Sequence, residues 1–298
     1  MTSHVEVEIA DQPDCWRRAV ELAATPVAAG LPERGERVAV VGCGTSLFMA
    51  RSYAALREGA GHGETDAFAA SEMPAGRRYD RVLALTRSGT TTEVLEVLDR
   101  VRGTIAVTAL TADPDSPVIA AADRAVVLDF ADERSVVQTR FATTTLALFR
   151  AHLGEDLTDA IADAERAVHE PLPAWVADRT QFTFLGRGWT VGLADEAALK
   201  IREASLSWAE SYPAMEYRHG PIAVTGEGSA VWMFGPAPEG LARQVAATGG
   251  RWIEQELDPL ASLITVQRMA VGLGIARGLD PDLPRHLTRS VILRSASA

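Results

Sequence analysis

The chain has 298 residues, of which 47% are hydrophobic and 23% are charged, and its formal net charge is -11 with a sequence pI near 5.1. This composition excludes a disordered or low-complexity protein, and the acidic balance argues against a protein that binds nucleic acid or an anionic membrane. Two cysteines, Cys15 and Cys43, are too few for a disulfide framework or a four-cysteine zinc site. No apolar run reaches the roughly 20 residues that span a bilayer, and residues 1–12 lack the apolar core of a signal peptide. We therefore expect a soluble cytoplasmic protein.

Short apolar strands alternate with helices along the first half of the chain. The pattern predicts an opening helix over 14–30, strands over 37–42, 81–86, 104–110 and 125–130, and a long helix over 139–153. Continuous apolar strands that alternate with helices are typical of a parallel sheet covered on both faces. The predicted fold class is therefore α/β.

The pattern then restarts, which indicates a duplicated α/β unit. The strand over 181–186 ends in a Gly-x-Gly turn whose first glycine, Gly186, follows Gly42 by 144 residues. In this second half we also expect strands over 230–234 and 251–257, a helix over 260–276 and a tail over 279–298. We predict an N-terminal helical segment over 1–30 and two domains over 31–165 and 175–298.

Two turns after predicted strands carry small and hydroxylic side chains. The first, Gly42-Cys-Gly-Thr-Ser46, lacks the third glycine of a dinucleotide fingerprint, so NAD binding is rejected. The second, Thr86-Arg-Ser-Gly-Thr-Thr-Thr92, precedes a helix and is not a Walker loop, because no Gly-Lys-Ser/Thr follows. Each turn alone is explained by a helix cap, but two such turns after neighbouring strands favour a phosphate cradle.

Three charged residues share one face of a helix that begins near Leu193. Glu196, Lys200 and Glu203 are spaced i, i+4 and i+7, and Lys200 is the only lysine in the chain. A solvated ion pair is the ordinary explanation of this spacing. The helix follows the Gly-x-Gly turn, however, so we expect its first turns to border a ligand crevice. A glutamate held near a lysine in a partly dry cleft suits proton abstraction beside a carbonyl.

One histidine in a predicted loop is a candidate for acid–base catalysis. His219, in Tyr217-Arg-His-Gly-Pro221, titrates near neutrality and suits general acid catalysis. A histidine before Gly-Pro is by itself more often an ordinary loop residue, so this signal needs support from other residues.

Taken together, these residues resemble the sugar isomerase (SIS) domain family in its double-domain form, over about residues 30–294. The family includes the isomerase half of glucosamine-6-phosphate synthase and stand-alone phosphosugar isomerase and deaminase proteins. The motifs that carry the resemblance are Cys43-Gly-Thr-Ser46, Thr86-Arg-Ser-Gly-Thr-Thr91, Val136-Val-Gln-Thr-Arg-Phe-Ala-Thr-Thr144, Phe184-Leu-Gly-Arg-Gly188, Glu196-Ala-Ala-Leu-Lys-Ile-Arg-Glu203, Glu210 through Pro221, and Pro284-Arg-His-Leu-Thr-Arg-Ser-Val291.

The resemblance implies two tandem flavodoxin-like domains, each with a five-stranded parallel sheet, in a homodimer with sites shared between subunits. It implies that Glu203 moves a proton between C1 and C2 of a sugar phosphate and that His219, from a neighbouring subunit, opens the sugar ring. Lys200 is the third implied catalytic residue. The implied substrate-binding and phosphate-binding residues are Thr45, Ser46, Thr86, Arg87, Ser88, Thr91, Val136, Glu196 and Arg289.

Three departures from the family pattern bear on the chemistry. The glutamine-hydrolysing domain and a cysteine at position 2 are absent, so we expect no ammonia production from glutamine. Arg289 stands where the synthase has a lysine that forms a Schiff base, and a guanidinium cannot form that adduct. Arg87 stands where the synthase has a neutral glutamine. It could add a bidentate phosphate contact or change the substrate.

The sequence therefore predicts an aldose–ketose isomerase, or a deaminase, that acts on a sugar or amino-sugar 6-phosphate. No metal or other cofactor is implied, and no nucleic-acid or membrane partner. The alternative is a non-catalytic module that binds a phosphosugar for regulation. A sensor has no need of Glu203, Lys200 and His219 together, which favours the enzyme.

Overall fold

The computed structural model describes residues 2–293, and the chain in it forms two compact units. We call them the five-stranded unit and the four-stranded unit after their sheets. Within the described residues, the five-stranded unit contains Cys15–Glu133, Arg140–Glu155 and the tail segment 287–293. The four-stranded unit contains residues 2–14 together with Arg134–Thr139 and Asp156–His286. These units are not the same sets of residues as the predicted domains, whose bounds remain a prediction.

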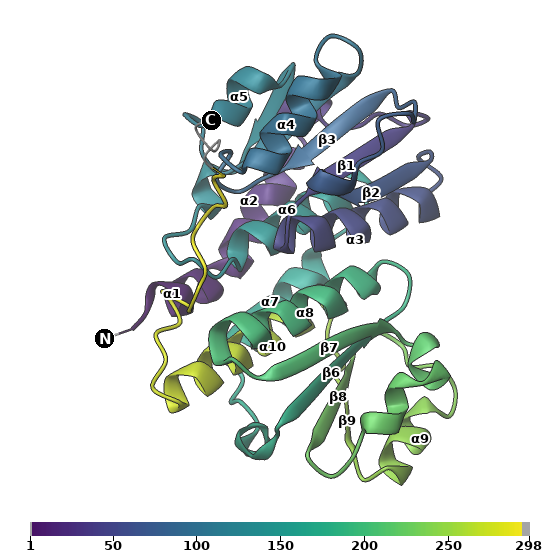
Figure 1. The fold of residues 1–298 in the computed structure, drawn as a ribbon, viewed down its shortest axis with the longest axis vertical. Coiled ribbons are helices and arrows are strands. Elements are labelled where there is room, and N and C mark those ends of the chain that lie inside the picture. Colours follow the sequence, from purple (N-terminus) through teal and green to yellow (C-terminus); the bar gives the residue numbers. More distant parts are fainter. Residues whose placement is uncertain (1, 294–298) are drawn as a thin grey trace, which may run out of the picture. The chain divides into compact units, whose positions relative to one another are not determined.

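The five-stranded unit is a parallel sheet in the order β2-β1-β3-β4-β5 (Figure 1). Its strands are β1 (Val38–Gly42), β2 (Thr65–Ala69), β3 (Arg81–Leu85), β4 (Ala106–Thr111) and β5 (Arg124–Val127). Its helices are most of α2 (Gln12–Ala23), then α3 (Thr45–Gly59), α4 (Thr92–Val101), α5 (Pro117–Ala121) and α6 (Arg140–His152), with short 3₁₀ turns at Pro26–Gly30, Ala70–Glu72 and Asp129–Ala131.

Helices cover both faces of this sheet because its strands are apolar on both sides. β1 and β3 are buried at every residue. Ala39 and Val41 join the core beneath α4 with Val94 and Leu98. On the other face α3 packs against α6, where the rings of Tyr53 and Phe149 stack with their centroids 3.9 Å apart. This arrangement of buried parallel strands is the one predicted.

The four-stranded unit is a parallel sheet in the order β7-β6-β8-β9 (Figure 1). Its strands are β6 (Gln181–Gly186), β7 (Trp208–Pro213), β8 (Ser229–Met233) and β9 (Arg251–Glu254). Its helices are α1 (His4–Ala10), α7 (Thr158–His169), α8 (Thr190–Ser205), α9 (Leu241–Ala247) and α10 (Pro259–Ala276), with 3₁₀ turns at Ala174–Asp178, Glu216–His219 and Pro221–Val224. α8 packs against α10, and α10 against α7.

The predicted α/β class with two parallel sheets is confirmed. The expectation of five strands in each sheet was wrong, since the second sheet has four strands within residues 2–293. After β9 the chain enters α10 and then an irregular tail, so that sheet has no counterpart of β5. Its strand order otherwise matches that of the first four strands of the other sheet.

Several elements differ from those predicted. The helix predicted over 14–30 corresponds to α2, which ends at Ala23, and Pro26–Gly30 forms a 3₁₀ turn instead. A separate helix, α1, precedes it. The edge strands β2 and β7 were missed because they are only partly buried and lack a strong apolar pattern. α7 was also missed, and it crosses the predicted end of the first domain at residue 165.

α10 is long and apolar enough to cross a membrane by length and composition alone. However, 72% of this segment is buried inside the protein, and it packs against α7 and α8. A core helix passes the same test, so we interpret α10 as the core helix of the four-stranded unit.

Candidate active site

The turn from β1 to α3 brings backbone N–H groups and hydroxyls to one edge of the five-stranded sheet. Gly44 has a φ of 53°, and a Cβ at Gly42 would lie 2.8 Å from the main-chain carbon of Ser46, so glycine is needed at both positions. Thr45 and Ser46 form the first turn of α3 and are each 6% exposed. The N-terminus of α3, a 15-residue helix, therefore lies at this turn and carries a partial positive charge.

The turn from β3 to α4 is fixed by its own hydroxyl groups. The Thr86 hydroxyl accepts a hydrogen bond from the Gly89 N–H at 3.2 Å, and the Ser88 hydroxyl accepts from the Thr90 N–H at 3.3 Å. Gly89 has a φ of 63°, and a Cβ there would clash with Ser116. Because β1 and β3 are neighbouring parallel strands, this turn and the β1–α3 turn lie at the same edge of the sheet. Thr91 is the residue before α4, so the predicted phosphate residues lie on these two turns.

Arg87 belongs to the same turn, but its side chain is engaged elsewhere. The guanidinium is 3% exposed and pairs with the fully buried carboxylate of Glu133, Nη1 to Oε2 at 3.2 Å. Its Nη2 donates to the main-chain oxygen of Arg289 at 3.2 Å. A phosphate contact by Arg87 therefore has to compete with a buried ion pair.

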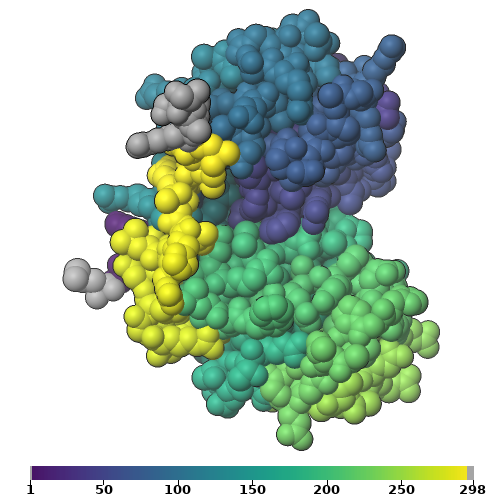
Figure 2. Space-filling view, in the orientation of Figure 1, coloured from purple at the N-terminus to yellow at the C-terminus, as the bar shows by residue number. Residues whose placement is uncertain are grey.

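The tail lies against this turn within the five-stranded unit. The hydroxyls of Thr90 and Ser290 are 2.8 Å apart, and the Thr92 N–H, at the start of α4, donates to the Val291 oxygen at 3.2 Å. Figure 2 shows the yellow tail segment on the molecular surface, and Val291 is half exposed. The Thr92 N–H of α4, one of the groups expected to face a ligand, therefore donates to the tail instead.

Arg289 is tied to the segment that carries Glu133. Its Nη1 donates to the Glu133 main-chain oxygen at 2.5 Å, and its Nη2 pairs with the carboxylate of Asp132. The sequence pattern does not single out Asp132 or Glu133. The signal was weak, since an acidic pair before a helix ordinarily lies on the surface.

Cys43 lies in the β1–α3 turn and is not a reactive thiol. Burial, together with the nearby negative charge of Glu93, raises the pKa of the Cys43 thiol above its usual value. The thiol is therefore protonated at neutral pH, so it is a poor nucleophile.

In the four-stranded unit, α8 places three charged groups together as the helical spacing predicted. Lys200 Nζ is 2.6 Å from Glu203 Oε2 and 3.4 Å from Glu196 Oε1. The side chains of Lys200 and Glu196 are 1% and 0% exposed, whereas that of Glu203 is 18% exposed. This is not a solvated surface pair. Glu203 is the member of the cluster that solvent or a ligand can reach.

The position of Glu203 corrects one step of the sequence argument. α8 begins at Thr190, and Glu203 lies in its last turn, about 20 Å along the helix axis at 1.5 Å per residue. The first turns of α8 follow the Gly-x-Gly turn, so Glu203 is at the opposite end of the helix from that turn. There it borders a small hollow of about 30 Å³ that is also lined by residues between Leu279 and Arg285. Leu206, which ends α8, has a φ of 54°, a left-handed conformation rare for leucine.

Two other predicted site residues of this unit, His219 and Val136, lie outside α8. His219 is exposed in the 3₁₀ turn Glu216–His219, and within residues 2–293 its side chain makes no hydrogen bond or ion pair. Val136 is partly buried, and its N–H donates to the Asp282 oxygen at 3.2 Å. Their predicted roles therefore remain predictions.

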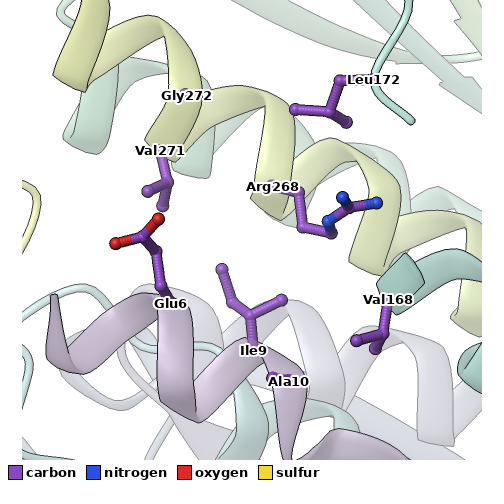
Figure 3. Close-up of a pocket in the computed structure, with 8 residues that line it drawn as sticks. All are labelled: Glu6, Ile9, Ala10, Val168, Leu172, Arg268, Val271 and Gly272. Atoms are coloured by element: carbon purple, nitrogen blue, oxygen red, sulfur yellow. The ribbon is translucent and has the colours of Figure 1, made fainter. Parts of the chain in front are cut away.

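A separate pocket of about 270 Å³ opens among α1, α7 and α10. Figure 3 shows Glu6 and Ile9 of α1 on one side of it and Arg268 and Val271 of α10 on the other. Arg268 Nη1 donates to the main-chain oxygens of Ala167 and Glu170 at 2.7 and 2.6 Å. None of the residues predicted from the sequence lines this pocket, so it is not the candidate active site.

No family model matches the chain. It is 27% identical over 296 residues to a glutamine–fructose-6-phosphate aminotransferase (isomerizing) of Sulfurisphaera tokodaii, and 29% identical over 349 residues to that of Aeropyrum pernix. These alignments cover 87% and 95% of this chain but 50% and 56% of the relatives. The chain thus spans about half the length of these curated relatives.

Solved structures with the same fold cover nearly the whole chain. A glucosamine-6-phosphate deaminase of Thermotoga maritima matches with a TM-score of 0.83 at 25% identity, over 98% of this chain and 100% of that one. A tagatose-6-phosphate ketose/aldose isomerase of Escherichia coli shares the fold, with a TM-score of 0.77 at 18% identity, over 99% of this chain and 97% of that one. These findings agree with the resemblance to the sugar isomerase (SIS) domain family. The double-domain form of that family remains a prediction.

Proposed function

We propose that the chain is a phosphosugar isomerase or an amino-sugar-phosphate deaminase. The observation that carries the proposal is the Lys200–Glu203 pair, which places a partly exposed carboxylate 2.6 Å from a buried ammonium. The pair lies in a chain that aligns with about half the length of an isomerizing aminotransferase. The chain also shares its fold with a glucosamine-6-phosphate deaminase over the whole length of that protein. The substrate is proposed to be a hexose or hexosamine 6-phosphate.

The phosphate is proposed to bind at the β1–α3 and β3–α4 turns. Two helix N-termini at one sheet edge offer partial positive charge, and the hydroxyls of Thr45, Ser46, Thr86, Ser88 and Thr91 offer donors. Val136, Glu196 and Arg289 are proposed to line the substrate site, with Arg87 as a further group at the phosphate turn.

The proposed reaction is a proton transfer along the open-chain sugar. Glu203 removes the proton from C2, the C2–H electron pair forms the C1–C2 double bond of an enediol or enolamine, and the aldehyde oxygen is protonated. Return of the proton to C1, with loss of the proton from the C2 hydroxyl, gives the ketose. When the substrate is an amino sugar, the C2 amino group loses a proton instead and a C2 imine forms. Water then adds to the imine and ammonia leaves, so that amino-sugar phosphate and water give ketose phosphate and ammonia. His219 is proposed to assist ring opening by proton transfer.

The direct test is a panel of hexose and hexosamine 6-phosphates with ketose and ammonia measured in parallel. Ketose without ammonia identifies an isomerase, and equal amounts of both identify a deaminase. Tight binding of a sugar phosphate with no turnover on any of them would instead support a regulatory binding module.

A further inference from the structure

Glu133 is a fully buried carboxylate with contacts on both of its oxygens. Its Oε2 accepts from Arg87 Nη1 at 3.2 Å, and its Oε1 accepts from the Arg140 N–H at 2.8 Å. Arg140 is the first residue of α6, so the carboxylate lies at the positive end of that helix. Glu133 is therefore stabilised as an anion by both a helix terminus and a guanidinium.

Arg87 is held at both its main chain and its side chain. Its main-chain oxygen accepts from the Thr111 hydroxyl and from the Ala112 N–H, each at 3.1 Å. Its guanidinium reaches Glu133 in one direction and the main-chain oxygen of Arg289 in another. One side chain thus links the phosphate turn, the segment before α6 and the tail.

The net charge of the Arg87–Glu133 pair decides how strongly Arg87 can attract a phosphate. A buried guanidinium beside a fully buried carboxylate presents little net positive charge to a dianion. Removal of only one partner leaves the other charge buried and uncompensated, which is the costly case, whereas removal of both leaves a neutral site.

We propose that Arg87 and Glu133 form a positioning pair that holds the phosphate turn and the tail in place, and that Arg87 is not itself a phosphate ligand. The inference rests on the proposed function only in taking the β3–α4 turn as the phosphate site. It states in addition that phosphate affinity at this turn comes from N–H and hydroxyl donors.

The decisive experiment measures the Kd of inorganic phosphate and of a hexose 6-phosphate for three variants of the full chain. Arg87→Gln removes the guanidinium that pairs with the Glu133 carboxylate beside the turn, so both Kd values should rise at least about ten-fold. Glu133→Gln added to Arg87→Gln should bring both within about three-fold of the original protein, because the pair is then neutral. If Arg87 contacts the phosphate directly, the double variant stays as weak as Arg87→Gln, and that result overturns the proposal.

A matched ion pair in the same unit provides the control. Arg81 pairs with Glu36 at 2.7 Å at the start of β3, which is the opposite end of that strand from the phosphate turn. Arg81→Gln removes the same type of side chain and should leave both Kd values unchanged. Should Arg87→Gln fail to fold, Arg87→Lys replaces it, because an ammonium keeps the pair with Glu133 while losing the bidentate fork. Retained affinity in Arg87→Lys agrees with positioning, and a ten-fold loss contradicts it.

A second measurement separates this inference from the proposed function. The Leu293 N–H donates to the Thr92 hydroxyl at 2.9 Å, so its hydrogen exchange reports how firmly the tail is held. Exchange should be several-fold faster in Arg87→Gln and unchanged in Arg81→Gln, whether or not the protein binds phosphate. Equal exchange in both variants would overturn the positioning role. Absence of phosphate binding by the original protein would overturn the proposed function alone.

Discussion

Ser88 combines two roles at the phosphate turn, since its hydroxyl accepts from the Thr90 N–H and the Thr90 hydroxyl while remaining a possible donor to a ligand. Ser88→Ala and Thr91→Val should each raise KM for the sugar phosphate strongly and leave kcat less affected, because the phosphate is remote from the reacting carbons. Steady-state kinetics measures both constants. Thr104→Ala is the control, since Thr104 caps the far end of α4 through the Val101 oxygen. An unchanged KM in both turn variants would place the phosphate elsewhere.

Glu203 is the residue on which the proposed chemistry depends. Glu203→Gln should lower kcat by about 10²–10⁴, the usual contribution of a positioned general base, and should leave the fold intact because the side chain is partly exposed. Borohydride added with substrate tests the covalent alternative at the only lysine. A substrate-sized mass gain at Lys200 would show an imine mechanism, and full activity in Glu203→Gln would remove the catalytic role from α8.

Glu36 offers a pH-dependent test at the residue scale. Burial by itself raises the pKa of Glu36, but its hydrogen bonds from Arg81 and from the Glu33 N–H, with the charge of Arg81, lower it on balance below the ordinary 4.5. A lowered pKa means that the pair stabilises the folded chain at neutral pH and that this contribution is lost as the pH falls through the folded pKa. The free energy of unfolding of Glu36→Gln should therefore be lower than that of the original protein at pH 7. The difference should shrink below pH 4.5. A difference that is constant across this range would contradict the ion-pair explanation.

At the scale of elements, α10 contains two glycines with opposite surroundings. A Cβ at Gly272 would meet Leu172 Cδ1 at an ordinary 3.5 Å, whereas a Cβ at Gly274 would lie 2.2 Å from the main-chain oxygen of Ala204 in α8. Gly272→Ala should raise the free energy of unfolding by about 1 kcal/mol through helix propensity. Gly274→Ala should lower it by about 1–3 kcal/mol, because the backbone of α8 has to move. Urea denaturation measures both, and equal effects would show that α8 and α10 do not pack this closely.

The bounds of the four-stranded unit follow from contacts between distant segments of the chain. The Asp282 carboxylate accepts from the N–H groups of His4 and Val5, both at 2.8 Å. Glu8 accepts from the Arg134 N–H at 2.6 Å, and its other oxygen accepts from the Ser135 hydroxyl. A fragment limited to residues 175–298 would lack α1 and the segment 134–139, which belong to this unit.

At the scale of the whole molecule, we propose a homodimer in which His219 acts in the site of the neighbouring subunit. The exposed position of His219, without a partner in residues 2–293, is compatible with this role. Glu203→Gln and His219→Ala should each be inactive alone, and mixing with subunit exchange should restore part of the activity, because one site of a mixed dimer then has both residues intact. The measurement is activity against mixing ratio, with exchange followed by differently tagged subunits. Verified exchange without recovery would contradict shared sites.

The linear pattern of residues was enough to predict the α/β class, the buried central strands, the two hydroxyl-bearing turns and the shared face of Glu196, Lys200 and Glu203. These features depend on local periodicity and turn chemistry, which a linear pattern contains. The edge strands β2 and β7 were missed because edge strands are partly solvated and carry little apolar signal. Only the tertiary structure joined Arg87 to Glu133, 46 residues apart, and the tail to the β3–α4 turn. Which buried charge meets which partner is decided by strand order and helix placement, and neither is encoded in the spacing of the residues along the chain.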